Sequence, residues 1–265
     1  MQKVGMNARR TVQSQGHMDA MERPFPGLSR NDSSDDPSGR FEVRTLLVTF
    51  RHGGDVFPVS AFRGAVVEKV GREYALFHNH EEDGSSVYRY PLIQYKFVGR
   101  QPAVFCAGDG VDEIHRLFLI PRWKLDIQGR SVQLQVDRLD LRTSGVRLSP
   151  RPFAYRLQGW MGLNESNRRV FHSLGSRLQR REMMERILTA NILAFAKGIG
   201  WHVPGGIYVS LDSPPIQRTA TFKGRPVNVF DLDFHCNVAL PEGLGLGKAV
   251  SLGFGVLQPI QNPFS

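Results

Sequence analysis

Two histidines that flank a single asparagine, His78 and His80, are the side chains of this sequence best suited to acid–base chemistry. Imidazole titrates near neutral pH, so a pair of histidines can supply both a base and an acid. The stretch 75–80 is strand-like, and side chains two residues apart on a strand point to the same face. We therefore expect the two imidazoles to lie close together.

Three interpretations of this pair stay open on the residues alone. A metal site would need further ligands; the acids directly after the pair could contribute, but the sequence holds no other His/Cys cluster. Exposed loop histidines without a role are the second interpretation. The third is cleavage of RNA, in which a base takes the 2′-OH proton, that oxygen attacks the adjacent phosphate, and an acid protonates the departing 5′-oxygen.

RNA cleavage of this kind also needs a cation near the phosphorus in the transition state, but neither a metal nor a cofactor. The stretch after the histidines offers phenols and cations: Tyr88, Arg89, Tyr90 and Lys96. Alternating aromatic and apolar residues are also a usual packing pattern of strands. Each of these residues therefore has a purely structural alternative.

A glycine-rich loop occupies residues 243–255, with Lys248 as its charged residue. It lacks the GxxxxGK[ST] pattern of a P-loop, and it lacks the helix that must follow a dinucleotide-binding fingerprint. Such a loop lets the backbone approach a ligand and can turn free N–H groups toward an anion; the alternative is a turn between two strands. The glycines concerned are Gly243, Gly245, Gly247, Gly253 and Gly255.

The net charge of +9 favours a polyanionic partner such as nucleic acid, with charge for solubility as the alternative. Basic residues gather in the stretch 167–181, where Phe171 and His172 lie between them. Arginine with interleaved aromatic residues suits phosphate contact and base stacking, or else forms a solvated helix face. The arginines concerned are Arg168, Arg169, Arg177, Arg180 and Arg181.

The order of expected elements predicts an α+β chain with two tandem ferredoxin-like (βαββαβ) units. The first comprises a strand at 41–50, a helix at 58–71, strands at 87–99 and 101–108, a helix at 111–120 and extended chain at 124–141. The second comprises a strand at 151–163, helix from 165 to 197 broken near Gly175, strands at 207–211, 216–222 and 226–240, and a last strand after the glycine-rich loop. The expected domains are a disordered leader at 1–40, an N-terminal domain at 41–148 and a C-terminal domain at 149–265.

The cellular setting follows from what the sequence lacks. Cys106 and Cys236 have no CxxC partners, so we expect buried thiols in a reducing cytoplasm. No apolar run is long enough to cross a membrane, and the first residues have no apolar signal-peptide core.

Five segments in order resemble the CRISPR-associated repeat-RNA-processing endoribonucleases of the RAMP (repeat-associated mysterious protein) superfamily. They are AFRGAVVEKVG (61–71), LFHNH (76–80), YRYPLIQYK (88–96), ILAFAKGIGW (192–201) and GLGLGKAVSLGFGVL (243–257). The resemblance covers roughly residues 42–258. The leader is not part of the family pattern.

The resemblance implies two ferredoxin-like domains that face each other across a basic cleft holding CRISPR repeat RNA. It implies one metal-independent cut per repeat, which leaves a 5′-hydroxyl and a 2′,3′-cyclic phosphate. His80 is then the principal acid–base residue and His78 its partner, with Tyr88 as the orienting group, Tyr90 behind it and Lys96 as a weaker phosphate contact. Lys248 and the backbone of the loop glycines are implied RNA contacts.

Two alternatives remain beside this enzyme. A RAMP-fold subunit that holds guide RNA without cutting it would keep the glycine-rich loop and the basic helix, but it would not need the histidine pair. A metal-dependent nuclease would lose its activity in EDTA. Association with CRISPR effector-complex subunits, or of two copies with each other, stays open; a membrane partner is not expected.

Overall fold

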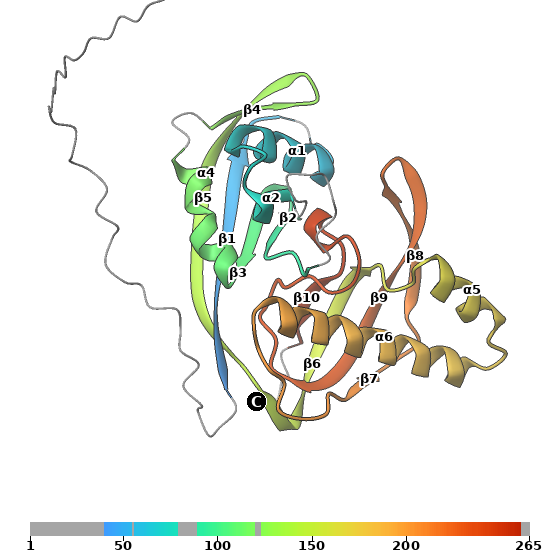
Figure 1. Cartoon of the computed structure of the whole chain (residues 1–265). Coiled ribbons are helices and arrows are strands. Elements are labelled where there is room, and N and C mark those ends of the chain that lie inside the picture. Colours follow the sequence, from blue (N-terminus) through green and yellow to red (C-terminus); the bar gives the residue numbers. More distant parts are fainter. Residues whose placement is uncertain (1–39, 55, 79–88, 120–122, 261–265) are drawn as a thin grey trace, which may run out of the picture. The chain divides into compact units, whose positions relative to one another are not determined.

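The computed structural model describes residues 40–54, 56–78, 89–119 and 123–260, all of which fall in one compact unit, Asp36–Ser265. Two five-stranded antiparallel sheets form its framework (Figure 1). The described residues run through both ferredoxin-like units in the expected order, which confirms the predicted fold class.

The first unit contains β1 (Phe41–His52), α1 (Val59–Val70), α2 (Ala75–His78), β2 (Ile93–Val98), β3 (Gln101–Ala107), α3 (Asp109–Glu113), α4 (His115–Phe118), β4 (Lys124–Ile127) and β5 (Arg130–Val146). Its strand order is β2-β3-β1-β5-β4. Helix α1 begins after Pro58 and ends at Gly71, as the sequence predicts. The single helix expected at 111–120 is wrong in detail, because Ile114 separates two short helices.

The second unit contains β6 (Leu148–Trp160), α5 (Glu165–Ser173), α6 (Arg177–Gly198), β7 (Val209–Leu211), β8 (Ile216–Phe222), β9 (Arg225–Val238), the 3₁₀ turn η1 (Val250–Leu252) and β10 (Val256–Pro259). Its strand order is β10-β6-β9-β7, with β8 also paired to β9. The glycine-rich segment and η1 stand where a ferredoxin-like unit has its second helix. The last strand expected after the glycine-rich loop is β10. Within the loop, Ala249 and Gly253 adopt left-handed conformations on either side of η1.

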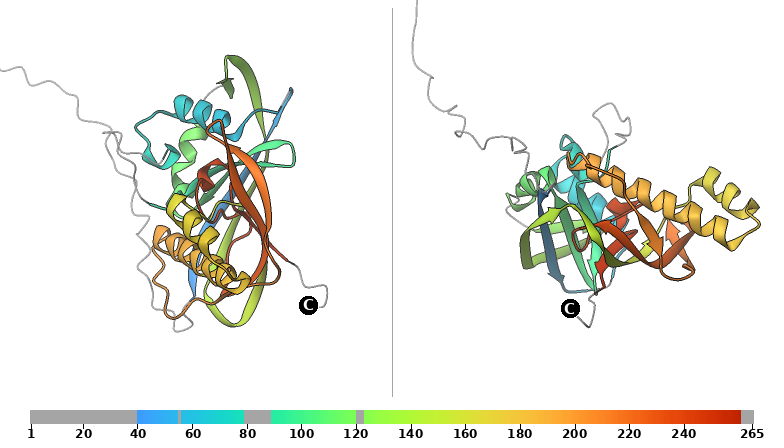
Figure 2. Two further views of the ribbon diagram at one scale, coloured as in Figure 1. Left: turned by 90° about the vertical axis from the view of Figure 1, so that its right-hand side faces the viewer. Right: turned by 90° about the horizontal axis from the view of Figure 1, so that it is seen from below.

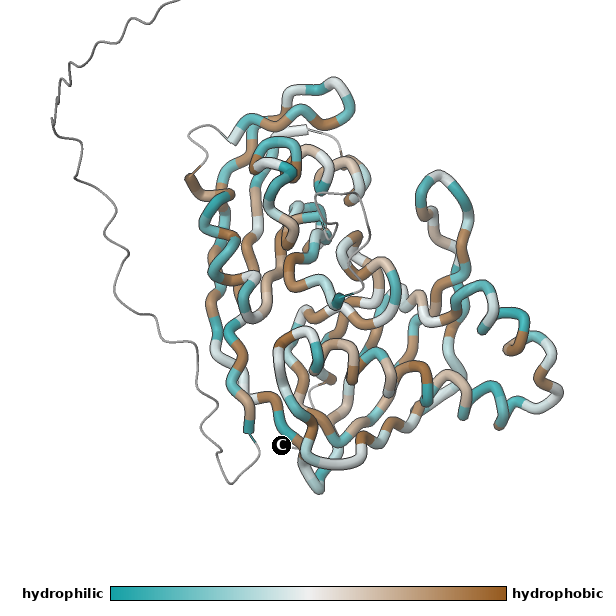
Figure 3. Tube along the Cα trace, viewed as in Figure 1, coloured by the Kyte–Doolittle hydropathy of each residue, from teal (hydrophilic) through white to brown (hydrophobic). Residues whose placement is uncertain are grey.

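Helices α5 and α6 confirm the predicted break near Gly175, and they differ in burial. The side chain of Asn164 caps α5 by accepting a hydrogen bond from the N–H of Asn167, and Ser176 caps α6 in the same way. Helix α6 runs across the second sheet (Figure 2) and buries Met184, Leu188 and Phe195 against it. Helix α5 has no buried residue and follows a mainly hydrophilic course (Figure 3).

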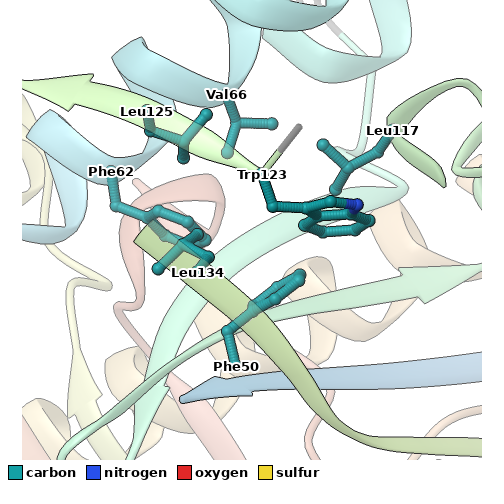
Figure 4. Close-up of a pocket in the computed structure, with 7 residues that line it drawn as sticks. All are labelled: Phe50, Phe62, Val66, Leu117, Trp123, Leu125 and Leu134. Carbon is teal, nitrogen blue, oxygen red and sulfur yellow. The ribbon is translucent and has the colours of Figure 1, made fainter. Parts of the chain in front are cut away.

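Two apolar cores hold the framework together. One lies between α1, α2, α4 and the first sheet, and contains a small hollow of about 10 Å³ lined by apolar side chains such as Phe50, Phe62 and Trp123 (Figure 4). The other lies between α6 and the second sheet and continues into the first unit through Leu92 and Phe105. The hollow is about the size of one water molecule and has no polar lining, so it is a packing gap of the core.

Candidate nucleic-acid interface and histidine site

Residues 75–78 form a short helix, so the strand predicted for 75–80 is wrong for this part. The N–H of Phe77 donates to the carbonyl of Tyr74 at 3.1 Å, and the Phe77 side chain is 1% exposed in the first core. This apolar anchor at the turn after α1 overrides the strand-like composition of the segment. His78 lies in helix α2, so the predicted strand does not position it. His80 and Tyr88 lie outside the described residues.

His78 ends α2 and is tied to the main chain around it. Its Nε2 lies 2.5 Å from the carbonyl oxygen of Arg72, and its own carbonyl accepts a hydrogen bond from Nη2 of Arg63 in α1. A carbonyl can only accept, so Nε2 of His78 carries the hydrogen. The ring is therefore held in one tautomer by the loop between α1 and α2.

Strand β2 has two faces, and they separate Lys96 from His78. The hydroxyl of Tyr95 donates to the carbonyl of Phe77 at 3.3 Å, which places Tyr95 on the side of α2. Lys96 follows Tyr95 directly and points to the opposite face of the sheet. The structure therefore does not bring Lys96 together with His78, contrary to the expectation that Lys96 would contact the phosphate beside the histidines.

Lys96 is 3% exposed and contacts the glycine-rich loop. Its Nζ donates to the carbonyl of Gly243, lies 3.3 Å from Oε1 of Gln94, and sits 4.6 Å from the centre of the Phe105 ring. Burial lowers the pKa of Lys96 to about 7, because water no longer stabilises the ammonium form.

Tyr90 and Gln94 both hydrogen-bond to the backbone of one loop residue, Gly245. The Tyr90 hydroxyl donates to the Gly245 carbonyl at 2.6 Å, and the Gly245 N–H donates to Oε1 of Gln94 at 3.0 Å. The Gln94 amide in turn donates to the Tyr90 hydroxyl at 2.8 Å. Burial raises the pKa of Tyr90 well above its usual value. The segment YPLIQYK thus fastens the loop to the first sheet, a role that the sequence reasoning missed.

The N–H groups of most loop glycines are used inside the protein, so the expectation that they are free to face an anion is wrong for them. Gly243 donates to Leu257, Gly253 to Val250 and Gly255 to Gly159, in addition to the Gly245 contact with Gln94. Gly255 has a φ of +64°, and a Cβ there would lie 1.9 Å from the carbonyl oxygen of Leu246. These glycines are needed for close packing of the loop.

The leucines between the glycines explain why the loop is so compact. Leu244 and Leu246 are fully buried in the core that continues between the two units. Gly247 has a φ of +101°, and a Cβ there would lie 2.8 Å from the Trp160 ring. Lys248 is exposed, and its backbone N–H donates to the carbonyl of Met161. The loop therefore presents one cation to solvent on a rigid backbone.

A groove of about 730 Å³ lies along the helix-free face of the first sheet and is also lined by β6, β8, β10 and the glycine-rich loop. Its cations are Lys96, Arg138, Arg142 and Arg218, and its acids are Asp137, Asp140 and Glu242. Hydrogen bonds from Arg142 and from Arg138 hold the pKa of Asp140 below its usual value. The groove carries both signs of charge, so it is less basic than the cleft that the resemblance implies.

The arginines of α5 and α6 are not equivalent. Arg168 and Arg169 pair with Glu165, while Arg180 donates twice to the carbonyl of Leu174. Arg181 binds Glu185 and the carbonyl of Leu211, so it docks α6 on β7. Within the described part of the chain, Arg177 is exposed and has no ion pair. Arg177 is therefore the most available of the five for a phosphate.

The two cysteines, the possible metal ligands and the helix lengths bear on the remaining expectations. Cys106 and Cys236 are free, buried thiols, as predicted, and burial raises the pKa of both. Among the described residues, no three His, Cys, Asp or Glu side chains are grouped so that they could hold a metal ion. In the same part of the chain, no helix combines the length and the apolar composition that crossing a membrane requires.

The described residues form two ferredoxin-like units with a glycine-rich loop before the last strand, the arrangement that the resemblance to the RAMP superfamily implies. The models of the Cas6b N-terminal domain and the Cas6b C-terminal domain match residues 41–145 and 147–260. The chain belongs to the Cas6b family.

Solved structures and one curated relative are similar to this chain. A crystal structure of Cas6b has a TM-score of 0.73 at 22% identity, with 83% of this chain and 100% of that chain covered. A crystal structure of a CRISPR RNA processing endoribonuclease Cas6b has a TM-score of 0.62 at 20% identity with the same coverage. The uncharacterised protein MJ0978 of Methanocaldococcus jannaschii is 31% identical over 96 residues, which span 36% of this chain and 64% of the relative.

Proposed function

We propose that this chain is a metal-independent endoribonuclease that cuts precursor CRISPR RNA within the repeat to generate guide RNAs. The observation that carries the proposal is the match of both Cas6b domain models, which together span almost all of the described residues. A similar solved protein is described as a CRISPR RNA processing endoribonuclease, and we transfer that activity to this chain. The FHNH segment supplies the imidazoles that the reaction needs.

The proposed reaction is an attack by the 2′-oxygen on the adjacent phosphorus. The 2′-O–P bond forms as the P–O5′ bond breaks; the 2′-OH proton goes to a base, and an acid protonates the 5′-oxygen. The products are a 2′,3′-cyclic phosphate and a 5′-hydroxyl. No oxidant, reductant or external nucleophile is consumed, so two imidazoles are sufficient for the proton transfers.

His80 is proposed as the principal acid–base residue and His78 as its partner, with Tyr88 as the orienting phenol. The hydrogen bond from Nε2 of His78 to the Arg72 carbonyl supports this division. A ring nitrogen that is committed to a main-chain carbonyl is poorly placed to shuttle a proton, so the main transfer falls to His80. Tyr90 and Lys96 act on the glycine-rich loop and hold the two units together.

Exposed cations of the second unit are proposed to contact the phosphates of the repeat RNA. Arg177 and Lys248 are both exposed. Arg168 and Arg169 share one carboxylate, Glu165, so they carry an excess of positive charge. Phosphate contacts of this kind supply affinity and depend on salt.

Cleavage of repeat RNA from the same genome in EDTA tests the proposal, with the wild type compared with His80→Ala and His78→Ala. We expect the wild type to cut once per repeat, His80→Ala to lose the cut, and His78→Ala to retain part of the rate. His202→Ala is the matched control, because His202 is exposed in the segment after α6 and belongs to neither the histidine site nor the basic stretch. Tight binding without a cut would instead establish a subunit that holds guide RNA.

A further inference from the structure

Two carbonyls at the end of α2 receive hydrogen bonds from long side chains of the first unit. Nη2 of Arg63, in α1, donates to the carbonyl of His78, and the hydroxyl of Tyr95, in β2, donates to the carbonyl of Phe77. The last carbonyls of a helix have no partner within that helix, so such contacts fix how the helix ends. Together with the Nε2 contact to Arg72, they determine the position of His78 from both sides.

The surroundings of Arg63 are unusual for an arginine. Its Nε is buried, and no described group accepts a hydrogen bond from it. Within the described residues Arg63 has no carboxylate partner either, and its guanidinium donates to the His78 carbonyl. Burial lowers the pKa of Arg63 below its usual value. A charge placed there without a carboxylate is a poor way to gain stability, because desolvation costs more than one carbonyl contact returns.

Arg63 also belongs to the same side of the first sheet as His78, whereas Lys96 lies on the other. Of these two cations of the first unit, Arg63 alone contacts the residue that precedes the Asn79–His80 dipeptide. Lysine could place one donor there but not the planar fork of a guanidinium.

We propose that Arg63 is a positioning residue for RNA cleavage: by holding the carbonyl of His78 it fixes the end of α2, and with it the ring of His78. This inference rests on the proposed function. A displacement of about 1 Å in such a group can reduce a rate by roughly 10²-fold, so loss of the Arg63 contact should affect the chemical step.

The test is Arg63→Met, which keeps a long side chain but removes every donor. Arg72→Met is the matched control, because the Arg72 side chain pairs with exposed Glu68 and its carbonyl, which binds His78, remains. Single-turnover cleavage of repeat RNA should fall by about 10²-fold in Arg63→Met and by less than about 3-fold in Arg72→Met. The Kd for a repeat RNA with a 2′-deoxy cut site should change by less than about 3-fold in both, and Arg63→Lys should recover part of the rate.

A readout that does not depend on cleavage separates this inference from the proposed function. The ring ¹⁵N signals of His78 report which nitrogen carries the hydrogen. We expect Arg63→Met and Arg63→Lys to shift these signals, and Arg72→Met to leave them as in the wild type. Unchanged signals together with an unchanged cleavage rate in a folded Arg63→Met protein would overturn the positioning role. If the wild type does not cut at all, the proposed function fails. The His78 signals alone then show whether Arg63 positions the His78 ring.

If Arg63→Met fails to fold, Tyr95→Phe provides the second variant. It removes the neighbouring bond to the Phe77 carbonyl, which acts on the same end of α2. A cleavage rate that falls by about 10-fold with unchanged Kd would support the positioning of α2 by side chains. A wild-type rate and wild-type His78 signals in both Tyr95→Phe and Arg63→Lys would contradict it.

Discussion

Replacement of Gln94 by methionine should weaken the attachment of the glycine-rich loop and lower the free energy of unfolding. The size of the loss follows from the hydrogen bonds that Gln94 makes. Gln94 is fully buried, and Met has nearly its length and volume without its amide. The change leaves the buried N–H of Gly245 without an acceptor. An orphaned buried donor costs about 1–3 kcal/mol.

Two other hydrogen-bond partners of Gln94 each keep another partner, so losing Gln94 costs less free energy there. The Tyr90 hydroxyl keeps the Gly245 carbonyl as its acceptor, and Lys96 keeps the carbonyl of Gly243. We therefore expect Gln94→Met to lower the free energy of unfolding by about 2–3 kcal/mol. Tyr90→Phe should lower it by about 1–2 kcal/mol, because it leaves one carbonyl without its donor. The double variant should lose less than the sum, since both side chains bind Gly245.

Urea unfolding followed by circular dichroism measures these differences. Gln179→Met is the matched control, because Gln179 is exposed on α6 and should tolerate the change within about 0.5 kcal/mol. A Gln94→Met protein as stable as this control, at an equal denaturant slope, would refute the reasoning. So would strictly additive effects of the Gln94 and Tyr90 changes.

Three further predictions concern the buried lysine, the loop and the basic helix. The unfolded Lys96 holds its proton up to a pKa of about 10.5 and the folded one only to about 7; from pH 7 to about 8.5 the free energy of unfolding should therefore rise by about 1.4 kcal/mol per unit, and Lys96→Met should abolish this rise in pH-dependent urea unfolding. Above about pH 8.5 the raised pKa values of the buried Cys106 and Cys236 thiols act in the opposite direction. Gly255→Ala should cost about 3 kcal/mol in thermal unfolding through its contact with a carbonyl, whereas Gly224→Ala, at φ +74° in open space, should cost only about 1 kcal/mol; equal losses would show that strain alone matters. Arg177→Ala should reduce the salt dependence of repeat-RNA binding by about 0.7 in slope, while Arg181→Ala, which undocks β7, should lower stability with the slope unchanged.

The sequence predicts the strands and long helices well, because their apolar residues follow the periods of the elements. The break between α5 and α6 and the caps at Asn164 and Ser176 depend on neighbours along the chain and can be read locally. The helix at 75–78 could not be predicted locally, because it depends on the burial of Phe77 against a sheet that forms from distant strands.

The candidate site shows the same limit. The sequence identifies the histidines, the YPLIQYK segment and the glycine-rich loop, but their partners lie far apart in the chain. Tyr90 and Gly245 are separated by 155 residues, and so their hydrogen bond is invisible to local patterns. One signal was available: a glutamine at position 94, within an apolar stretch, must find buried partners if the strand is internal.

Loss of cleavage on removal of a single 2′-hydroxyl tests the central claim most directly. The substrate is repeat RNA with one 2′-deoxy nucleotide on the 5′ side of the cut, compared with all-ribose RNA in EDTA. We predict that the all-ribose RNA is cut to a 2′,3′-cyclic phosphate and a 5′-hydroxyl, and that the deoxy RNA binds equally well but stays intact. Cleavage of the deoxy RNA at the same phosphate, or a requirement for Mg²⁺, would contradict the account.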